Sequence, residues 1–382
     1  MITFCTHSRV IARQGFLKCS HFVRTMTTST EDVLFETKGK AGIITLNRPK
    51  ALNALNLSMA RKIHPQLKKW ETELSFVVIK GSGEKAFCAG GDIRAVTEAG
   101  RNKDPSAVGF FKLEYLINNT IGTYKIPYVA LIHGITMGGG VGLSVHGKYR
   151  VATEKTVFAM PETAIGLFPD VGGSYVLPRL PNQLGTFYGL TGYRLSGLDV
   201  LKGGIATHFC EFNKIVDLEK EILAVSDPNE IPRILDKYTK ESLTKQDKEF
   251  SLQPNINQIE KHFSFDTVEE ILASLTNENS SWSLSQLETL KKMSPTSMKL
   301  TLRLIREGAQ MSLQDCLEME FRVVTRVLSE KDFYEGVRAL LIDRDNNPVW
   351  DPATIEQVTN EKLQTFFDLL PTKEELKLRN KL

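Results

Sequence analysis

The chain has 382 residues, of which 41% are apolar, 24% charged and 8% aromatic, a composition typical of folded globular proteins. This balance excludes an intrinsically disordered chain and a collagen-like repeat, and no apolar run approaches the roughly 18 residues that span a bilayer. The lack of such a run predicts no insertion into a membrane, and the small net charge of +3 predicts no nucleic-acid partner.

Residues 1–30 differ in composition from the rest of the chain. They contain four basic residues, no acidic residue and nine Ser or Thr residues among scattered apolar side chains. This composition predicts a mitochondrial transit peptide, with a mature N-terminus near residues 25 to 33 and a location in the matrix. A secretory signal fits poorly, since Arg13 and Lys18 interrupt every candidate apolar core. The remaining alternative is a basic tail that carries no address.

The cysteines argue against a disulfide framework. Cys5 and Cys19 lie in the predicted transit peptide, which leaves Cys88, Cys210 and Cys316 in the mature chain. These three are widely spaced, odd in number and without a CxxC pair, as expected for a reducing compartment and not for a cysteine zinc site. Cys88 is either a nucleophile or, more commonly for such a residue, a small buried thiol.

The N-terminal part of the predicted mature chain has the pattern of a hairpin followed by a helix. Residues 33–37 and 42–46 alternate as two strands around a turn at Gly39. In residues 57–70, Ile63, Leu67 and Trp70 share one helical face, and Pro65 predicts a kink or a helix start there. A short buried strand is predicted at residues 76–79. The glycine-rich stretch that follows, up to Asp92, is predicted to be irregular.

Residues 128–173 continue the alternation. An apolar strand at residues 128–132 is followed by a glycine turn and then a helix within residues 133–143. Further strands are predicted at 149–152 and 157–160, and another turn follows at 168–173. Strands that alternate with helices in this way indicate the α/β class.

Beyond Gly204 the sequence predicts helices. Residues 211–292 form short amphipathic helices joined by polar stretches, Ser294 caps a helix opened by Pro295, and apolar residues recur at helical spacing from Leu313 to Leu328. The chain therefore divides into a core at residues 31–210 that carries the active site, a helical insertion at 211–292 and a C-terminal helical region at 293–382.

Two stretches resemble phosphate-binding loops only superficially. Residues 81–86 nearly match the dinucleotide fingerprint, but the glycine-rich residues that follow cannot open the helix that the fingerprint requires. Residues 142–148 spell GxxxxGK, but Tyr149 stands where a Ser or Thr must bind magnesium. We therefore expect no nucleotide cofactor.

The two glycine clusters around Gly91 and Gly139 have a common explanation. Each follows a short apolar stretch, and glycine lets a backbone amide approach a ligand closely. Two such turns can direct two amides at one oxygen, which is the arrangement of an oxyanion hole for an ester or thioester. The alternative is that both glycines only allow tight turns.

Two carboxylates follow prolines in a largely apolar segment. Glu162 follows Pro161 and Asp170 follows Pro169. Desolvation among apolar neighbours raises a carboxyl pKa and suits a general base or a nucleophile, whereas the alternative is two solvated loop residues. No metal site is expected, since the histidines lack metal-ligand spacing.

At these residues the chain resembles the crotonase (enoyl-CoA hydratase/isomerase) superfamily. The likeness extends from residue 32 to about 350, and it is carried by residues 46–55, 86–93, 133–143, 160–173 and 332–339. The resemblance implies a crotonase-like spiral of ββα units with a helical C-terminal region. It also allows a homo-oligomer, because members of the family often self-associate.

The resemblance assigns roles to particular positions. The amides of Gly91 and Gly139 would bind the thioester carbonyl, and Glu162 would be the catalytic glutamate, either as nucleophile or as activator of water. Asp170 would hold a substrate hydroxyl and help position water, and Glu114 matches a further substrate-contacting position. The CoA groove would be lined by Lys50, Ala51, Leu52, Ala89, Asp92 and Ile93. No cofactor is implied, because CoA is part of the substrate.

One departure from the family pattern indicates the reaction. Hydratases of the family carry a second glutamate at the position of Gly142. Without that glutamate, an enzyme that adds water across a double bond has only one of its two acid–base groups. Residues 160–173 and the long insertion at 211–292 make the resemblance strongest to the branch that hydrolyses the thioester of 3-hydroxyisobutyryl-CoA in valine breakdown, with 3-hydroxypropionyl-CoA as a related substrate. The alternatives are a hydratase or isomerase with a substitute carboxylate, and a non-catalytic relative that binds CoA or RNA.

Overall fold

The computed structural model describes residues 31–244 and 248–379, so the predicted transit peptide lies outside the described residues. The described part begins with the predicted hairpin, in which β1 (Val33–Lys38) pairs antiparallel with β2 (Ala41–Leu46). Gly39 takes the left-handed conformation in the turn, with φ of +59°.

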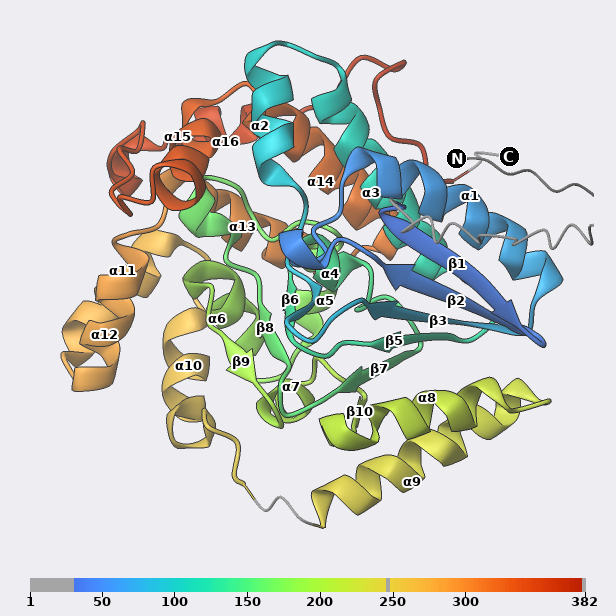
Figure 1. Cartoon of the computed structure of the whole chain (residues 1–382). Coiled ribbons are helices and arrows are strands. Elements are labelled where there is room, and N and C mark those ends of the chain that lie inside the picture. Colours follow the sequence, from blue (N-terminus) through green and yellow to red (C-terminus); the bar gives the residue numbers. More distant parts are fainter. Residues whose placement is uncertain (1–30, 245–247, 380–382) are drawn as a thin grey trace, which may run out of the picture. The chain divides into compact units, whose positions relative to one another are not determined.

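The hairpin begins a six-stranded sheet in the order β1-β2-β3-β5-β7-β10 (Figure 1). From β2 onward every neighbouring pair is parallel. The central strands are continuous apolar runs because both faces of the sheet are covered. The four strands that follow the hairpin in this order are β3 (Phe76–Gly81), β5 (Tyr128–Leu131), β7 (Tyr149–Ala152) and β10 (His208–Phe209).

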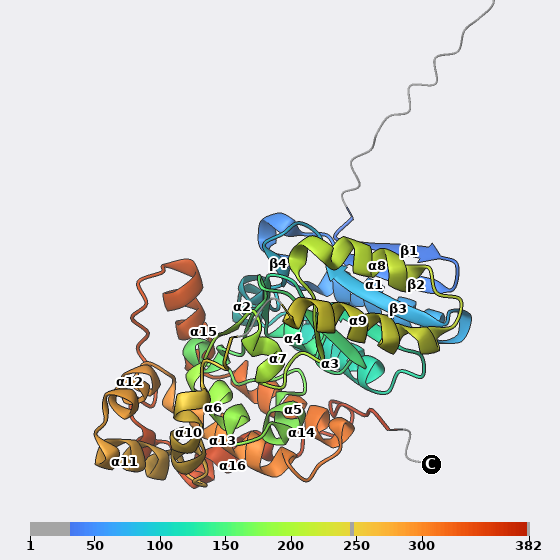
Figure 2. The same cartoon turned by 90° about the horizontal axis from the view of Figure 1, so that it is seen from below.

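Helices cover both faces of this sheet. Val77 and Ile79 of β3 belong to the large apolar cluster that includes α1 (Leu57–Glu73) and α3 (Ser106–Gly122). Phe76 and Val78 point the other way and pack on α8 (Ile215–Leu223) and α9 (Ile231–Leu243). Figures 1 and 2 show α8 and α9 lying across the strands on this second face.

A second, four-stranded sheet has the order β4-β6-β8-β9. Strands β3, β5 and β7 of the first sheet are each followed by a strand of the second and then by helical turns, which is the ββα repeat expected from the family. The strands are β4 (Ala86–Cys88), β6 (Ile135–Met137), β8 (Val157–Ala159) and β9 (Leu195–Ser196). The helices that follow these units are α2 (Ile93–Arg101), α4 (Gly139–Gly142), α5 (Gly173–Val176), α6 (Leu184–Thr191) and α7 (Asp199–Lys202).

Three sequence-based expectations were wrong in detail. Residues 86–88 are a strand and not part of an irregular loop, and β5 leads into a second strand, β6, before α4 begins. A three-residue strand is too short to show alternating apolar and polar residues in the sequence. Such strands form because they pair with neighbouring strands. The third concerns Pro65, where a helix start was one of two alternatives: α1 begins instead at Leu57, where Asn56 accepts a 2.8 Å bond from the Met59 amide, and Pro65 lies inside the helix.

The helices of residues 211–292 pack in two places. Whereas α8 and α9 cover the first sheet, α10, α11 and α12 contact α6 and α13. Their bounds are α10 (Ile256–Phe263), α11 (Val268–Glu278) and α12 (Ser281–Leu290). The predicted short helices are confirmed, and their separate packing partners were not foreseen.

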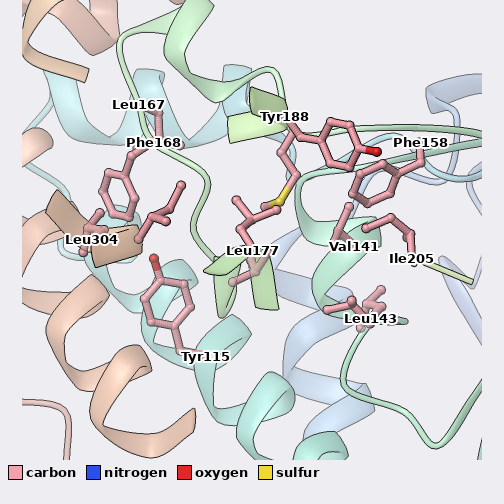
Figure 3. Close-up of a cluster of buried hydrophobic side chains, with 14 of the residues drawn as sticks. Tyr115, Val141, Leu143, Phe158, Leu167, Phe168, Leu177, Tyr188, Ile205 and Leu304 are labelled. Atoms are coloured by element: carbon pink, nitrogen blue, oxygen red, sulfur yellow. The ribbon is translucent and has the colours of Figure 1, made fainter. Parts of the chain in front are cut away.

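The C-terminal helices pack on the half of the molecule that carries the glycine turns. Ser294 caps α13 as predicted, and α14 packs on α3. Figure 3 shows Tyr115 of α3, Leu304 of α13 and Phe168 in one buried cluster. The helices are α13 (Pro295–Gly308), α14 (Leu313–Val327), α15 (Lys331–Val337) and α16 (Asn360–Phe367), with a π-helical turn η7 (Arg338–Ile342) after α15.

Candidate active site

A cavity of about 400 Å³ lies where the ends of β4 and β6 meet the segment after β8. Its wall combines glycine backbone, three carboxylates and apolar side chains. The lining residues are Ala89, Gly90, Gly91, Ile93, Phe111, Glu114, Met137, Gly138, Gly139, Pro161, Glu162, Ile165, Leu167, Asp170, Arg194, Leu340, Leu341 and Asn346. Every residue predicted to form the oxyanion hole or the catalytic pair is therefore on one surface.

The two glycine turns meet because β4 and β6 are neighbouring parallel strands, whose carboxyl ends lie at the same edge of a sheet. A Cβ built on Gly139 would lie 3.2 Å from the Gly91 amide nitrogen, so the two turns touch. Among the described residues, neither the Gly91 nor the Gly139 amide donates to a protein acceptor. Two unpaired amides side by side on a cavity wall can bind one carbonyl oxygen.

Three carboxylates converge on the same cavity from different elements. Glu114 comes from α3, Glu162 opens the 3-10 turn η2 (Glu162–Ile165), and Asp170 lies in the turn before α5. Their exposed fractions are 2%, 5% and 4%. Oε1 of Glu114 and Oε2 of Glu162 have no hydrogen-bond partner, whereas Asp170 Oδ2 accepts a 3.0 Å bond from the Tyr115 hydroxyl. Two buried carboxylate oxygens at the cavity thus have no hydrogen-bond partner among the described residues.

Burial controls the protonation of this cluster. It raises the pKa of Asp170 to about 7, although the hydrogen bond from Tyr115 acts in the opposite direction. Burial, with the charge of Asp170 added, raises the pKa of Glu162 well above its usual range. Burial and then the charges of Asp170 and Glu162 do the same to the pKa of Glu114. The cavity therefore does not hold three negative charges at neutral pH.

This burial predicts a stability change with pH. The pKa of Asp170 is higher in the folded state than in the unfolded chain, so the folded state binds more protons and loses stability as pH rises from about 4 through about 7. We expect Asp170→Asn to raise Tm above that of the wild type at pH 8, and the gain to shrink as pH falls toward 4. Thermal unfolding at pH 5, 6, 7 and 8 measures this, and a gain independent of pH would contradict it.

The positions predicted for CoA divide into two groups. Ala89 and Ile93 line the cavity. Lys50, Ala51 and Leu52 lie outside its wall, and the Leu52 carbonyl accepts a 3.0 Å bond from the Ala89 amide. Asp92, also off the wall, forms a 2.9 Å ion pair with Arg48, whose guanidinium donates to the Ala54 carbonyl as well. These contacts hold the Gly91 loop against residues 48–54.

Several residues at the cavity were not predicted from the sequence. Tyr115 orients Asp170, and Arg194 lies on the wall just before β9. Leu341, of the π-helical turn η7, closes the cavity together with Leu340 and Asn346, and Arg338 holds this segment through ion pairs with Glu335, Asp343 and Asp345. The likeness of residues 332–339 to the family's closing segment was the signal that could have drawn attention to this wall.

Neighbouring side chains occupy the space that a side chain at residue 142 would need. A Cβ built on Gly142 would lie 2.6 Å from Asn118 Nδ2 and 2.7 Å from the Val171 Cβ. Both neighbours are buried, so a glutamate at this position would require them to move. The structure therefore leaves no room for a second glutamate at residue 142.

The other sequence motifs have structural explanations. Cys88 is fully buried beside Gly90, and burial raises the pKa of its thiol to about 12, so it is not an activated nucleophile. Within residues 31–244 and 248–379, no cluster of His, Cys, Asp and Glu is arranged to hold a metal ion. No helix among these residues has both the length and the apolar character to span a bilayer.

Comparison with known protein families agrees with this geometry. Residues 41–367 match the family model for enoyl-CoA hydratase/isomerase. The proteins called 3-hydroxyisobutyryl-CoA hydrolase, mitochondrial, are similar to this chain: the Danio rerio protein is 56% identical over 89% of this chain and 90% of its own length. The Homo sapiens protein is 54% identical over 90% of each chain, and the Rattus norvegicus protein 49% over 95% of each.

Solved structures with the same fold carry other descriptions. A carnitinyl-CoA dehydratase from Mycobacterium thermoresistibile superposes with a TM-score of 0.84 and 35% identity, covering 92% of this chain and all of that one. An enoyl-CoA hydratase from Rhodobacter sphaeroides gives a TM-score of 0.81 and 34% identity over 91% of this chain and all of that one. The crotonase-like fold expected from the sequence is confirmed.

Proposed function

Since the chain belongs to the enoyl-CoA hydratase/isomerase family, we propose that its cavity hydrolyses the thioester of 3-hydroxyisobutyryl-CoA, releasing 3-hydroxyisobutyrate and CoA. The observation that carries the proposal is the pairing of two free glycine amides with buried, unpaired Glu162, where Gly142 leaves no second glutamate. Relatives that share half of the residues over nine-tenths of the chain bear the name of this activity. The reaction belongs to valine breakdown.

The amides of Gly91 and Gly139 bind the thioester carbonyl oxygen. When a nucleophile adds to the carbonyl carbon, negative charge develops on this oxygen, and the two N–H groups stabilise it without reorganising. Because the side chains around the cavity are almost fully buried, each such bond is worth more than it would be in bulk water. The C–S bond then breaks as the carbonyl re-forms, and the CoA thiolate takes up a proton.

Ionised Glu162 supplies the attack, and two routes fit its position. In one, the carboxylate removes a proton from a water molecule that adds to the carbonyl carbon. In the other, Glu162 adds directly, and water then opens the resulting mixed anhydride. Both routes consume one water and give one carboxylic acid and one thiol. Asp170 accepts the hydrogen bond of the substrate 3-hydroxyl, and Glu114 contacts the acyl part from α3.

Hydration of an enoyl-CoA is the second candidate, because structures described as a dehydratase and a hydratase share this fold at 34 to 35% identity. Asn118 and Val171 occupy the space for a side chain at residue 142, which argues against hydration. A hydratase would need another carboxylate, such as Asp170 or Glu114, in place of the missing acid–base glutamate.

The test is to measure thiol release from 3-hydroxyisobutyryl-CoA beside hydration of crotonyl-CoA with the same purified protein. We expect fast thiol release and negligible hydration, with 3-hydroxypropionyl-CoA also hydrolysed. Isobutyryl-CoA, which lacks only the hydroxyl, should be hydrolysed much more slowly, because the buried Asp170 then receives no hydrogen bond from the substrate. Hydration without thiol release would reject the proposal.

The proposal also concerns where in the cell the enzyme works. Its relatives are called mitochondrial, which supports a mitochondrial location, and the acid-free residues 1–30 support import into the matrix. Sequencing the N-terminus of the protein purified from the organelle tests this, and a start at Met1 would contradict it. The reaction as written needs no cofactor beyond the CoA of the substrate, and the family favours a homo-oligomer.

A further inference from the structure

A buried carboxylate outside the cavity holds the turn that carries Asp170. Glu320 lies on α14 and is completely buried, on a helix face that is otherwise apolar. Its Oε2 accepts a 2.8 Å bond from the Gly172 amide, and its Oε1 accepts bonds from the Ser174 amide at 2.9 Å and the Ser174 hydroxyl at 2.5 Å. These three donors belong to the residues that directly follow Asp170 and Val171.

The turn itself has an unfavourable backbone. Val171 has φ of +52° and Gly172 has φ of +83°, so two consecutive residues are left-handed, and the first is β-branched. For a β-branched residue such as Val171 this conformation is unfavourable and persists only where its surroundings impose it. His146 donates from Nε2 to the Val171 carbonyl at 2.7 Å, and burial lowers the pKa of His146 to about 4, which keeps it neutral.

The carboxylate of Glu320 has no other role that the structure shows. Burial raises the pKa of Glu320 to about 8, while the hydrogen bonds that its two oxygens accept from the Ser174 hydroxyl and from the Gly172 and Ser174 amides act in the opposite direction. Those donors in turn need an acceptor, because they are buried as well. The interaction is therefore mutual, and it links the helical C-terminal region to the catalytic turn.

We propose that Glu320 is a positioning residue for the thioester hydrolysis, which fixes the 171–174 backbone and thereby aims the Asp170 carboxylate into the cavity. The proposal rests on the proposed function. The Tyr115 hydroxyl on α3 donates to the same carboxylate. Asp170 is thus oriented directly by Tyr115 and, through the backbone of Gly172 and Ser174, by Glu320 on α14.

A double-mutant cycle tests this role. Glu320→Gln keeps the shape of the side chain but replaces one acceptor oxygen by a donor, which then faces backbone N–H groups. In the wild-type background we expect kcat to fall by about 10- to 100-fold, as for a displaced substrate-positioning group. In the Asp170→Asn background the same change should cost less than about 3-fold, because the group that it positions is already altered.

The matched control is Glu318→Gln, on the same helix, where the carboxylate accepts a bond from the Leu378 amide instead. It should leave kcat within about 2-fold of the wild type. If Glu320→Gln lowers kcat by the same factor in both backgrounds, the residue only supports the fold and the proposal is overturned. Should Glu320→Gln fail to fold, Ser174→Ala takes its place in the cycle, with a smaller expected loss.

Failure of the proposed function is separable from failure of this inference. A wild-type protein that releases no thiol rejects the hydrolase activity. The same cycle is then measured on the Kd of 3-hydroxyisobutyryl-CoA by calorimetry, because Asp170 lines the cavity whatever the reaction is. Loss of affinity on Glu320→Gln that disappears in the Asp170→Asn background supports the positioning role. An equal loss in both backgrounds overturns it.

Discussion

Replacing Glu162 by glutamine is expected to lower kcat for thiol release by about 10²- to 10⁴-fold, the usual contribution of a positioned acid or base. The glutamine has the same shape, but it can neither remove a proton from water nor add to the thioester. The oxyanion hole and the cavity wall remain, so the Kd of the CoA ester should change by less than about 3-fold. The protein should also stay folded, because the change removes a buried ionisable group and adds no volume.

The measurement is steady-state thiol release together with calorimetric binding of the substrate to the variant. Glu98→Gln is a suitable control, since Glu98 is an exposed glutamate on α2 near the cavity and should leave kcat unchanged. Turnover like that of the wild type in Glu162→Gln would remove Glu162 from the mechanism. Asp170 or Glu114 would then have to supply the base.

Replacing Gly139 by alanine is expected to lower kcat/KM by about 10²- to 10³-fold, the loss that follows when one donor of an oxyanion hole is removed. The added Cβ of Gly139→Ala would meet the Glu114 carboxylate and would lie 3.2 Å from the Gly91 amide nitrogen. It would therefore stand at the junction of the two amides, where the carbonyl oxygen has to bind. The loss comes from this blocked space, because the backbone amide of Gly139 itself is retained.

Gly109→Ala is the matched control for this substitution. Gly109 lies within α3, and a Cβ built on it meets no atom within 4 Å. Because alanine is favoured over glycine inside a helix by about 1 kcal/mol, this variant should be as active as the wild type and slightly more stable. If Gly139→Ala retained full activity, the carbonyl would have to bind elsewhere in the cavity.

The two expected losses concern different steps of one mechanism. Glu162 needs its negative charge, yet the burial that protects the site raises its pKa and that of the neighbouring acids. The cavity resolves this conflict by placing three carboxylates so close that they do not all ionise at once. One group can then act as a base while another donates a hydrogen bond.

The sequence by itself determined the fold class and the reaction type, and it singled out the glycines and two of the carboxylates that the structure brings together in the cavity. The apolar runs of β3 and β5 identified central strands because they are buried on both faces, and glycine at 91 and 139 marked close approaches of the backbone. Glu162 and Asp170 stood out as carboxylates in apolar surroundings. The absence of a carboxylate at Gly142 separated hydrolysis from hydration.

Only the tertiary structure decided which distant residues complete the site. Glu320 and Asp170 are 150 positions apart in the chain. The place of Glu320 on the apolar face of α14 indicates that it is buried, but not that its partners are the amides of a turn after Asp170. The three-residue strands β4 and β6 likewise exist because they pair with each other. Local patterns encode which face of an element is buried, whereas the partners that a buried polar group finds there depend on contacts between elements far apart in the chain.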